Sequence, residues 1–444
     1  GQALPLRDGA RVAVFGRLAF HYYKSGLGSG GLVNTRYVVG ILDALKECEG
    51  VHLDEKLMGI YEDWIMENPY DEGQGWGRVP WCQKEMGVTE EMLDCARRDD
   101  VSLVVIGRTA GEDQDNNAKA GSYCLTETEE DMIRRVCEVS KRTVVVLNVG
   151  NIIDMSWVQK YHPQAVLYVW QGGQEGGNGV ADVLTGKACA CGKLTDTIAA
   201  DIMDYPSTEN FGDPFKNYYK EDIYVGYRYF DTFGIMPLYC FGYGKGYTDF
   251  SLVTKEVTAD EKLVKVEVEV TNIGKVYPGR EVVQVYYSAP DGVMEKPTQE
   301  LAGFAKTKLL MPGEKEVVTV TFATEDMASY DSYDAAWVME EGEYTIRVGN
   351  SSRTTEVAAI IDLDETVQTV LLKNVMKDKE FVKEIHHMVP IFDLELDDTP
   401  FMRPILIYAE NFKKKIMEYE VLRTTLEDKR PAAHSRRCSR RVSV

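Results

Sequence analysis

The sequence Val101-Ser-Leu-Val-Val-Ile106 leads without a break into Gly107-Arg-Thr-Ala-Gly-Glu-Asp-Gln-Asp-Asn116. A short apolar run rich in valine and isoleucine, bounded by turn-forming residues, is typical of a strand that is buried on both faces. Three further runs have the same character, namely Val12 to Phe15, Val144 to Leu147 and Val166 to Trp170. We therefore expect four buried strands in the first part of the chain.

Helical stretches alternate with these runs. Thr126-x-x-Glu129 is a capping box that predicts a helix running toward Val136, and Thr89-x-x-Met92 is an imperfect version of it. Asn34 or Thr35 is expected to cap another helix, whose apolar face would carry Val38, Ile41, Leu42 and Leu45. Strands and helices that alternate at this spacing predict an α/β sandwich, a mostly parallel sheet with flanking helices, over residues 1–205. Ligands then gather at the carboxyl ends of its strands.

The remainder of the chain divides into three parts. Residues 206–250 are dense in tyrosine, glycine and proline and are expected to form an irregular connector. In residues 251–360 apolar and charged residues alternate, as at Val264, Val266, Val268 and Val270, which predicts a fibronectin type III-like β-sandwich. Residues 361–444 are expected to be a linker with helical character from Leu371 to about Leu426, followed by a basic tail. That tail is either a disordered arm or an artificial end to a longer gene.

Net charge and cysteine usage limit the partners. With 50 basic and 71 acidic side chains the 444-residue chain has a formal charge of −21, which repels nucleic acids and anionic lipid surfaces. Apolar runs fall far short of the roughly 20 residues that span a bilayer, and the N-terminus lacks the features of a signal peptide, so the chain is expected to be a fragment or a processed form. Nine scattered cysteines favour a reduced, cytoplasmic setting. Cys189-Ala-Cys191 has no histidine nearby, so we expect neither a metal nor a cofactor.

A glycine-rich loop, Gly26-Leu-Gly28-Ser-Gly30-Gly31, contains the pattern of a dinucleotide fingerprint. In such a fingerprint the first glycine directly follows the strand, whereas here ten residues separate Phe15 from Gly26. The interpretation we prefer is a flexible or substrate-facing loop, with nucleotide binding as the alternative.

The acidic cluster after Ile106 stands where a parallel sheet carries its active site. Glu112 follows Ala110-Gly111, and its neighbours Asp113 and Asp115 disfavour its ionised form and raise its pKa. A raised pKa is what a general acid requires, although an acidic surface turn is the alternative reading.

Several motifs in the same order resemble glycoside hydrolase family 3, which contains β-glucosidases and β-xylosidases. The resemblance covers about residues 4 to 360. It rests on Ala3-Leu-Pro-Leu6, Gly107-Arg-Thr-Ala-Gly-Glu112, Gly121-Ser-Tyr-Cys-Leu-Thr126, Gly172-Gly-Gln-Glu-Gly-Gly-Asn178, Tyr224-Val-Gly-Tyr-Arg-Tyr-Phe-Asp231, Pro237-Leu-Tyr-Cys-Phe-Gly-Tyr-Gly244 and Lys296-Pro-x-x-Glu-Leu-x-Gly-Phe304.

The resemblance implies roles for particular residues. Glu112 becomes the catalytic acid/base, since family members place that residue in an Arg-x-Ser/Ala-Gly-Glu motif. Asp113, where glycine is usual, and Trp76 are candidate substrate contacts, and Trp81 is a further tryptophan that stacks on a sugar or packs onto its own domain. Glu175 is interpreted first as a packing or capping residue and second as a sugar contact.

The resemblance also implies that a catalytic part is missing. A retaining glycosidase needs a second carboxylate about 5 to 5.5 Å from the acid/base, and in the family this nucleophile belongs to a (β/α)8 barrel. Glu62-Asp63-Trp64 echoes its motif but falls in a predicted helix, so we reject it. Because the α/β part comes first, the chain resembles the first half of a permuted β-glucosidase, with a β-glucoside or oligosaccharide as substrate and the barrel as missing partner. The alternative is a non-catalytic carbohydrate-binding or scaffold module.

Overall fold

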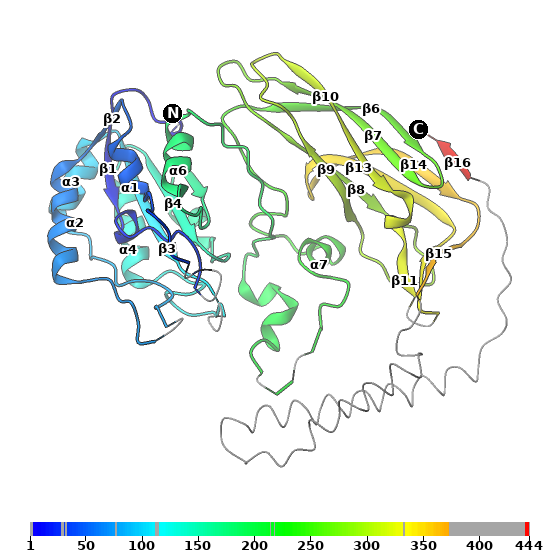
Figure 1. Cartoon of the computed structure of the whole chain (residues 1–444), viewed down its shortest axis with the longest axis horizontal. Coiled ribbons are helices and arrows are strands. Elements are labelled where there is room, and N and C mark those ends of the chain that lie inside the picture. The colour runs from blue at the N-terminus through cyan, green and yellow to red at the C-terminus, as the bar shows by residue number, and fades with distance from the viewer. Residues whose placement is uncertain are drawn as a thin grey trace, which may run out of the picture.

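The computed structural model describes residues 3–27, 31, 33–75, 78–111, 115–213, 215–216, 218–331, 334–372 and 440–443. Figure 1 shows an α/β layer on the left, a β-sandwich on the right, and a connector that carries helix α7 between them. None of the described helices is long and apolar enough to cross a membrane.

The α/β layer is built on one parallel sheet with the strand order β2-β1-β3-β4-β5. Its strands are β1 (Ala10–Phe15), β2 (Val51–Leu53), β3 (Val101–Arg108), β4 (Thr143–Val149) and β5 (Ala165–Tyr168). All four predicted strands are confirmed, and every residue of β3 and β4 is buried, as expected for central strands covered on both faces. The last predicted strand ends two residues early, because Trp170 has a φ of 55°, which an extended strand does not allow.

Helices cover both faces of this sheet. They are α1 (Ile41–Lys46), α2 (Glu55–Glu67), α3 (Glu90–Arg98), α4 (Glu127–Val139), α5 (Ser156–Tyr161) and α6 (Gly176–Thr185), with a short 3-10 helix η1 (Arg17–Ala19) after β1. Apolar residues of α1 and α6 pack with Val12, Val14 and Leu103 on one face. Those of α2 to α5 pack with Ala13, Phe15 and Val104 on the other. The predicted α/β sandwich is therefore confirmed.

Two of the three predicted helix starts are confirmed. Thr126 Oγ1 accepts from the Glu129 amide at 3.2 Å, and the Glu129 carboxylate accepts from the Thr126 amide at 2.8 Å, which is the reciprocal capping box. Thr89 Oγ1 accepts from the Met92 amide at 3.4 Å.

The helix predicted to start at Asn34 or Thr35 begins instead at Ile41. Gly40 precedes it and donates its amide to Asp43 Oδ2 at 3.0 Å. Val38 lies before the helix and is exposed, whereas Ile41, Leu42 and Leu45 are buried. The apolar spacing was right for these three residues, whereas Val38 is 38% exposed.

The connector contains the 3-10 helices η2 (Ile202–Asp204) and η3 (Pro206–Glu209) and the helix α7 (Tyr227–Thr232). Beyond it, antiparallel strands form sheets with the orders β10-β7-β6, β16-β14-β13-β8-β9 and β11-β12-β15. Their bounds are β6 (Phe250–Ala259), β7 (Leu263–Asn272), β8 (Val282–Ser288), β9 (Glu300–Lys306), β10 (Lys315–Ala323), β11 (Ser329–Asp331), β12 (Ala336–Met339), β13 (Gly342–Ser351), β14 (Thr354–Leu363), β15 (Val367–Leu371) and β16 (Arg440–Ser443), with a 3-10 helix η4 (Thr324–Met327) after β10.

The sandwich core contains the valines that the alternation predicted to be buried. Val264, Val266, Val268 and Val270 of β7 are fully buried and pack against residues of β8, β10 and β13. Leu371, predicted to open a helical stretch, instead ends β15 and pairs with Ala336 of β12. Beyond Leu372, the rest of that stretch and most of the basic tail lie outside the described residues.

Candidate active site

The loops that follow the parallel strands meet at the carboxyl edge of the sheet. Asn148, near the end of β4, ties two of them together, and its side chain is buried. Its Oδ1 accepts from the Tyr23 amide at 2.8 Å, and its Nδ2 donates to the carbonyls of Tyr23 at 3.0 Å and Trp170 at 2.7 Å. One buried amide thus holds the loop after β1 against the loop after β5.

Gly26 and Leu27, the first residues of the glycine-rich loop, lie against the segment that follows β3. The Leu27 amide donates to the Ala110 carbonyl at 2.5 Å, and Leu27 pairs with Gly111 in a parallel bridge. A Cβ atom on Gly26 would lie 2.4 Å from the Ala110 oxygen, and one on Gly111 would lie 2.5 Å from the Leu27 oxygen. Close approach of two backbones therefore requires glycine at both positions, independently of any nucleotide.

Arg108, the last residue of β3, anchors the segment that leads to the acidic loop. Its Nη1 and Nη2 each donate to one oxygen of Glu129 at 2.7 Å, a bidentate pair. Its remaining bonds go to the carbonyls of Gly107 at 2.7 Å, Ser122 at 3.0 Å and Cys124 at 3.2 Å. Burial lowers the pKa of the Arg108 guanidinium, but the Glu129 carboxylate outweighs burial and holds that pKa above its ordinary value. Arg108 is therefore a charged structural anchor.

On the far side of the acidic loop, Asn116 is held by a second set of bonds. Its Nδ2 donates to the Ile152 carbonyl at 3.0 Å, and its Oδ1 accepts from Ser122 Oγ at 2.7 Å. Ser122 Oγ also accepts from the Asn117 amide at 3.1 Å. The chain is thus fixed by Arg108 and Gly111 before the loop and by Asn116 after it.

The tryptophan loop joins the same edge. The Thr109 amide donates to the Trp81 carbonyl at 2.9 Å, so Trp81 lies beside the end of β3 with its side chain partly buried. A Cβ atom on Gly121 would lie 2.6 Å from Cys82 Sγ, which explains the glycine at this position. The predicted site residues Glu112, Asp113 and Trp76 lie outside the described residues, although Gly111 and Asn116, on either side of the first two, are placed at this edge.

Two other acidic candidates have local partners. Glu175 immediately precedes α6 and is exposed, and its side chain makes no bond that caps the helix. Its carboxylate accepts from Asn178 Nδ2 at 2.6 Å and from the Tyr37 hydroxyl. Glu62-Asp63-Trp64 lies within α2, as predicted, and the Arg17 guanidinium stacks over the Trp64 ring at 5.4 Å. Asp63 therefore belongs to a helix and does not lie at the end of a strand. The rejection of Asp63 as a nucleophile assumed this helical position.

One acidic group at this edge has no signal in the sequence. Glu85 Oε2 accepts from the Arg17 amide at 2.9 Å, just after β1, and Oε1 accepts from the Met86 amide at 2.8 Å. Burial raises the pKa of Glu85 to about 7, with a further contribution from the charge on Glu129, while the bonds from the Arg17 and Met86 amides oppose the rise. Its pKa follows from tertiary burial, which no local pattern reveals.

Among the described residues no group of three or more histidine, cysteine, aspartate or glutamate side chains could hold a metal ion. Cys189 and Cys191 are free thiols.

The chain has a parallel α/β layer, with Gly111 and Asn116 fixed at its carboxyl edge, followed by an antiparallel sandwich. These features define an α/β-sandwich protein with an appended fibronectin-like domain. The model of the glycosyl hydrolase family 3 C-terminal domain matches residues 1–247, and that of the fibronectin type III-like domain matches residues 281–352. The chain belongs to glycosyl hydrolase family 3.

The similar proteins are β-glucosidases. The chain is 44% identical over 408 residues to a β-glucosidase of Ruminococcus albus, covering 90% of this chain and 42% of that protein. It is 36% identical over 478 residues to β-glucosidase A of Butyrivibrio fibrisolvens, covering 95% and 56%. Among solved structures, a β-glucosidase from Paenibacillus barengoltzii superposes with a TM-score of 0.81 at 45% identity, covering 84% of this chain and 42% of that one. β-Glucosidase 3B from Thermotoga neapolitana, solved in complex with glucose, has a TM-score of 0.74 at 37% identity, with 82% and 52% covered. The chain thus spans about half the length of these relatives.

Proposed function

We propose that this chain takes part in hydrolysis of β-glucosidic bonds by a retaining mechanism and supplies its acid/base, Glu112, while a (β/α)8 barrel supplies the nucleophile. The observation that carries the proposal is the anchoring of the acidic loop at the carboxyl edge, with Arg108 and Gly111 before it and Asn116 after it. The names of the relatives, all β-glucosidases, support the substrate class.

In this mechanism Glu112 acts twice. It first donates its proton to the leaving glycosidic oxygen while the barrel carboxylate attacks the anomeric carbon and forms a glycosyl-enzyme intermediate. It then takes a proton from water as the water oxygen attacks the same carbon and releases the sugar. Its acidic neighbours Asp113 and Asp115 favour the protonated form that the first step needs. Asp113 and Trp76 are the proposed substrate contacts.

On this proposal the chain alone is nearly inactive, because it lacks the nucleophile. The eight cysteines within the described residues are free thiols, which supports a reducing, cytoplasmic setting. The second candidate, a non-catalytic carbohydrate-binding or scaffold module, draws on the observation that the chain matches only about half of each relative. It predicts that the folded chain alone binds glucose or cellobiose in calorimetry.

The test is to produce the chain together with the segment of the Ruminococcus albus β-glucosidase that it does not match, and to assay aryl β-glucosides. We expect Glu112→Gln to lower turnover by roughly 10²-fold to 10⁴-fold for a leaving group that needs protonation. For a nitrophenol of low pKa the loss in the first step should be far smaller, because the departing phenolate needs no proton. Glu62→Gln, which changes an exposed carboxylate on α2, is the matched control and should keep most of the activity. Equal turnover of Glu112→Gln and the unmodified chain would contradict the assignment.

A further inference from the structure

A cavity of about 300 Å³ lies where the end of the α/β layer, the end of the connector and the sandwich meet. Its lining comes from residues 190–193, 243–250 and 279–281 and from Asn350, Ser351 and Thr354. In its wall Lys193 Nζ pairs with Glu281 at 2.7 Å and donates to the Gly244 carbonyl at 3.0 Å. A largely buried ion pair therefore joins the α/β layer to the sandwich beside this cavity.

Two thiols lie together at the cavity. Cys191 lines it, and Cys189 is two residues away; both are free and partly exposed. The two thiols form a hydrogen bond with each other, and the Arg280 amide donates to the Cys189 sulfur. Two residues span at most about 7 Å of chain, whereas disulfides join Cα atoms about 4.4–6.8 Å apart. The pair therefore needs little movement to form a disulfide.

The segment that carries the thiols packs against the end of the connector. The Leu194 amide donates to the Tyr243 carbonyl at 2.8 Å. A Cβ atom on Gly246 would lie 2.6 Å from the Ala190 oxygen, so the two backbones are in close contact. Because this contact fixes the segment, Cys191 stays at the cavity.

The charges around the cavity favour an anionic molecule. Five charged side chains line it, three cations and two anions: Lys193, Lys245, Arg280, Asp249 and Glu281. Lys193 and Glu281 neutralise each other. Lys245 and Arg280 are exposed, and neither forms an ion pair with a described residue. In a chain of net charge −21 this is a local excess of positive charge, which attracts a small anion and repels a small cation.

We propose that Cys189-Ala-Cys191 is a redox modification site whose co-reactant is a small disulfide that carries carboxylates. The Cys191 thiolate attacks one sulfur of that disulfide and forms a mixed disulfide, and the other half leaves and takes up a proton. The Cys189 thiol then loses its proton and attacks the Cys191 sulfur, which releases the second half as a thiol. The two cysteines lose two electrons in total, and the small disulfide is reduced to two thiols.

The order of attack follows from the surroundings of the two sulfurs. Cys191 faces the cavity, where the small disulfide binds. Burial, followed by the neighbouring Cys191 thiol, raises the pKa of the Cys189 thiol, although Arg280 opposes the rise. Because the thiolate is the nucleophile, Cys189 is suited to the second step. The site involves neither Glu112 nor a barrel, so it is independent of the proposed function.

The experiment treats the full chain with an excess of glutathione disulfide, an anionic reagent. Remaining thiols are blocked with iodoacetamide, and trypsin then releases Ala188 to Lys193, a single peptide with both cysteines. We expect this peptide to lose two hydrogen atoms, to take up no iodoacetamide and to return to the dithiol form with dithiothreitol. Cys191→Ser should prevent closure, whereas Cys189→Ser should retain glutathione on Cys191. Thermal unfolding verifies that both variants fold.

The choice of an anionic co-reactant is measured with cystamine, a cationic disulfide. Each rate is divided by that of the synthetic peptide of residues 188–193, which corrects for the intrinsic reactivity of the reagent. The corrected rate should be higher for glutathione disulfide. Arg280→Gln should lower it by about twofold to fivefold, the size of an exposed charge interaction. Lys306→Gln, which changes an exposed lysine of β9 outside the cavity, is the matched control and should leave it unchanged.

Three results would overturn the proposal. The pair could remain a dithiol in excess glutathione disulfide, or Cys189→Ser could carry no glutathione on Cys191. The third is a corrected rate for cystamine that equals or exceeds the rate for glutathione disulfide, which would show that the cavity does not select an anion.

Discussion

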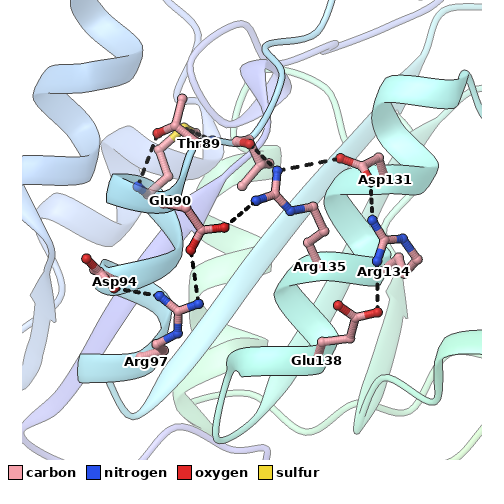
Figure 2. Close-up of polar contacts among 10 residues, drawn as sticks. Thr89, Glu90, Asp94, Arg97, Asp131, Arg134, Arg135 and Glu138 are labelled. Carbon is pink, nitrogen blue, oxygen red and sulfur yellow. Dashed lines mark hydrogen bonds and ion pairs between the residues drawn. The ribbon is translucent and has the colours of Figure 1, made fainter.

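Helix α4 carries charged residues in two different environments, and the two differ in what they contribute. At its first turn, Glu129 pairs with Arg108 beneath the candidate site, and the two side chains are only 4% and 1% exposed. On its outer surface, Asp131, Arg134, Arg135 and Glu138 join a network with Glu90 and Arg97 of α3 (Figure 2). Glu90, which links the two helices, is 71% exposed.

The outer network contains more ion pairs, yet water and salt screen each of them, and exposed pairs contribute little. The inner pair is isolated from water, so either partner left alone is a buried, uncompensated charge. The comparison teaches that burial, and not the number of ion pairs, decides which charges determine the structure here.

The largest effect is expected from breaking the inner pair. Arg108→Ala leaves the Glu129 carboxylate buried without its guanidinium and should destabilise the α/β layer by about 3–5 kcal/mol. The measurement is chemical denaturation of the full chain, following the transition of the α/β layer by tryptophan fluorescence.

A double variant sharpens this prediction. Arg108→Met combined with Glu129→Leu removes both charges and should recover part of the lost stability, since an apolar pair of similar volume is often as stable as a buried ion pair. If the double variant were less stable than either single variant, the loss would arise from the hydrogen bonds to Ser122 and Cys124 and not from the unpaired charge.

An intermediate effect is expected at Glu85, a partly buried carboxyl that accepts backbone amides. Its folded pKa of about 7 lies above the ordinary value of 4.5, so the folded state holds its proton more tightly than the unfolded state does. Stability from this group is therefore present at low pH and falls as the pH rises from about 4.5 through 7.

The variant Glu85→Gln isolates that dependence. It should reduce the difference in unfolding free energy between pH 5 and pH 8 by about 1–3 kcal/mol. Denaturant titrations of both proteins at several pH values measure it, and Glu62→Gln, an exposed position on α2, is the control. An unchanged pH dependence would mean that Glu85 does not titrate in this range.

The smallest effect is expected from the outer network. Glu90→Gln removes the carboxylate that joins Arg97 to Arg135 and should cost about 0.2–1 kcal/mol. Repeating the thermal unfolding at about 1 M salt should make most of that difference vanish, because the Debye length falls to about 3 Å. If Glu90→Gln lost several kcal/mol of stability and salt did not change that loss, the outer network would contribute as much to stability as the inner pair.

Local patterns predicted most of the fold. The valine-rich runs became the buried strands, and the Thr126 capping box became the start of α4. These features need only neighbouring residues, so the sequence carries them directly. The predictions differ from the structure at three places: the end of β5, the start of α1 and Leu371. Val38 lies before the helix and is exposed, and Leu371 extends a strand because it pairs with Ala336.

The candidate site also has one part that the local sequence predicts and another that only the fold brings together. A motif after β3 indicates where the acidic loop lies, because a parallel sheet presents its strand ends at one edge. The chain on either side of the loop is held by Glu129, Ser122 and Ile152, and only the fold brings Glu129 and Ile152 to it.

By itself, the sequence determined the alternation of strands and helices and the burial of the alternating valines in the sandwich. It also determined the resemblance that points to Glu112. Tertiary structure alone decided that Arg108 is an anchor, that Glu85 has a raised pKa and that the connector exposes its apolar side chains. The physical reason is that periodicity and capping act over a few residues. Burial, ion pairing and the pKa of a carboxyl instead depend on groups that the folded chain brings together from distant positions.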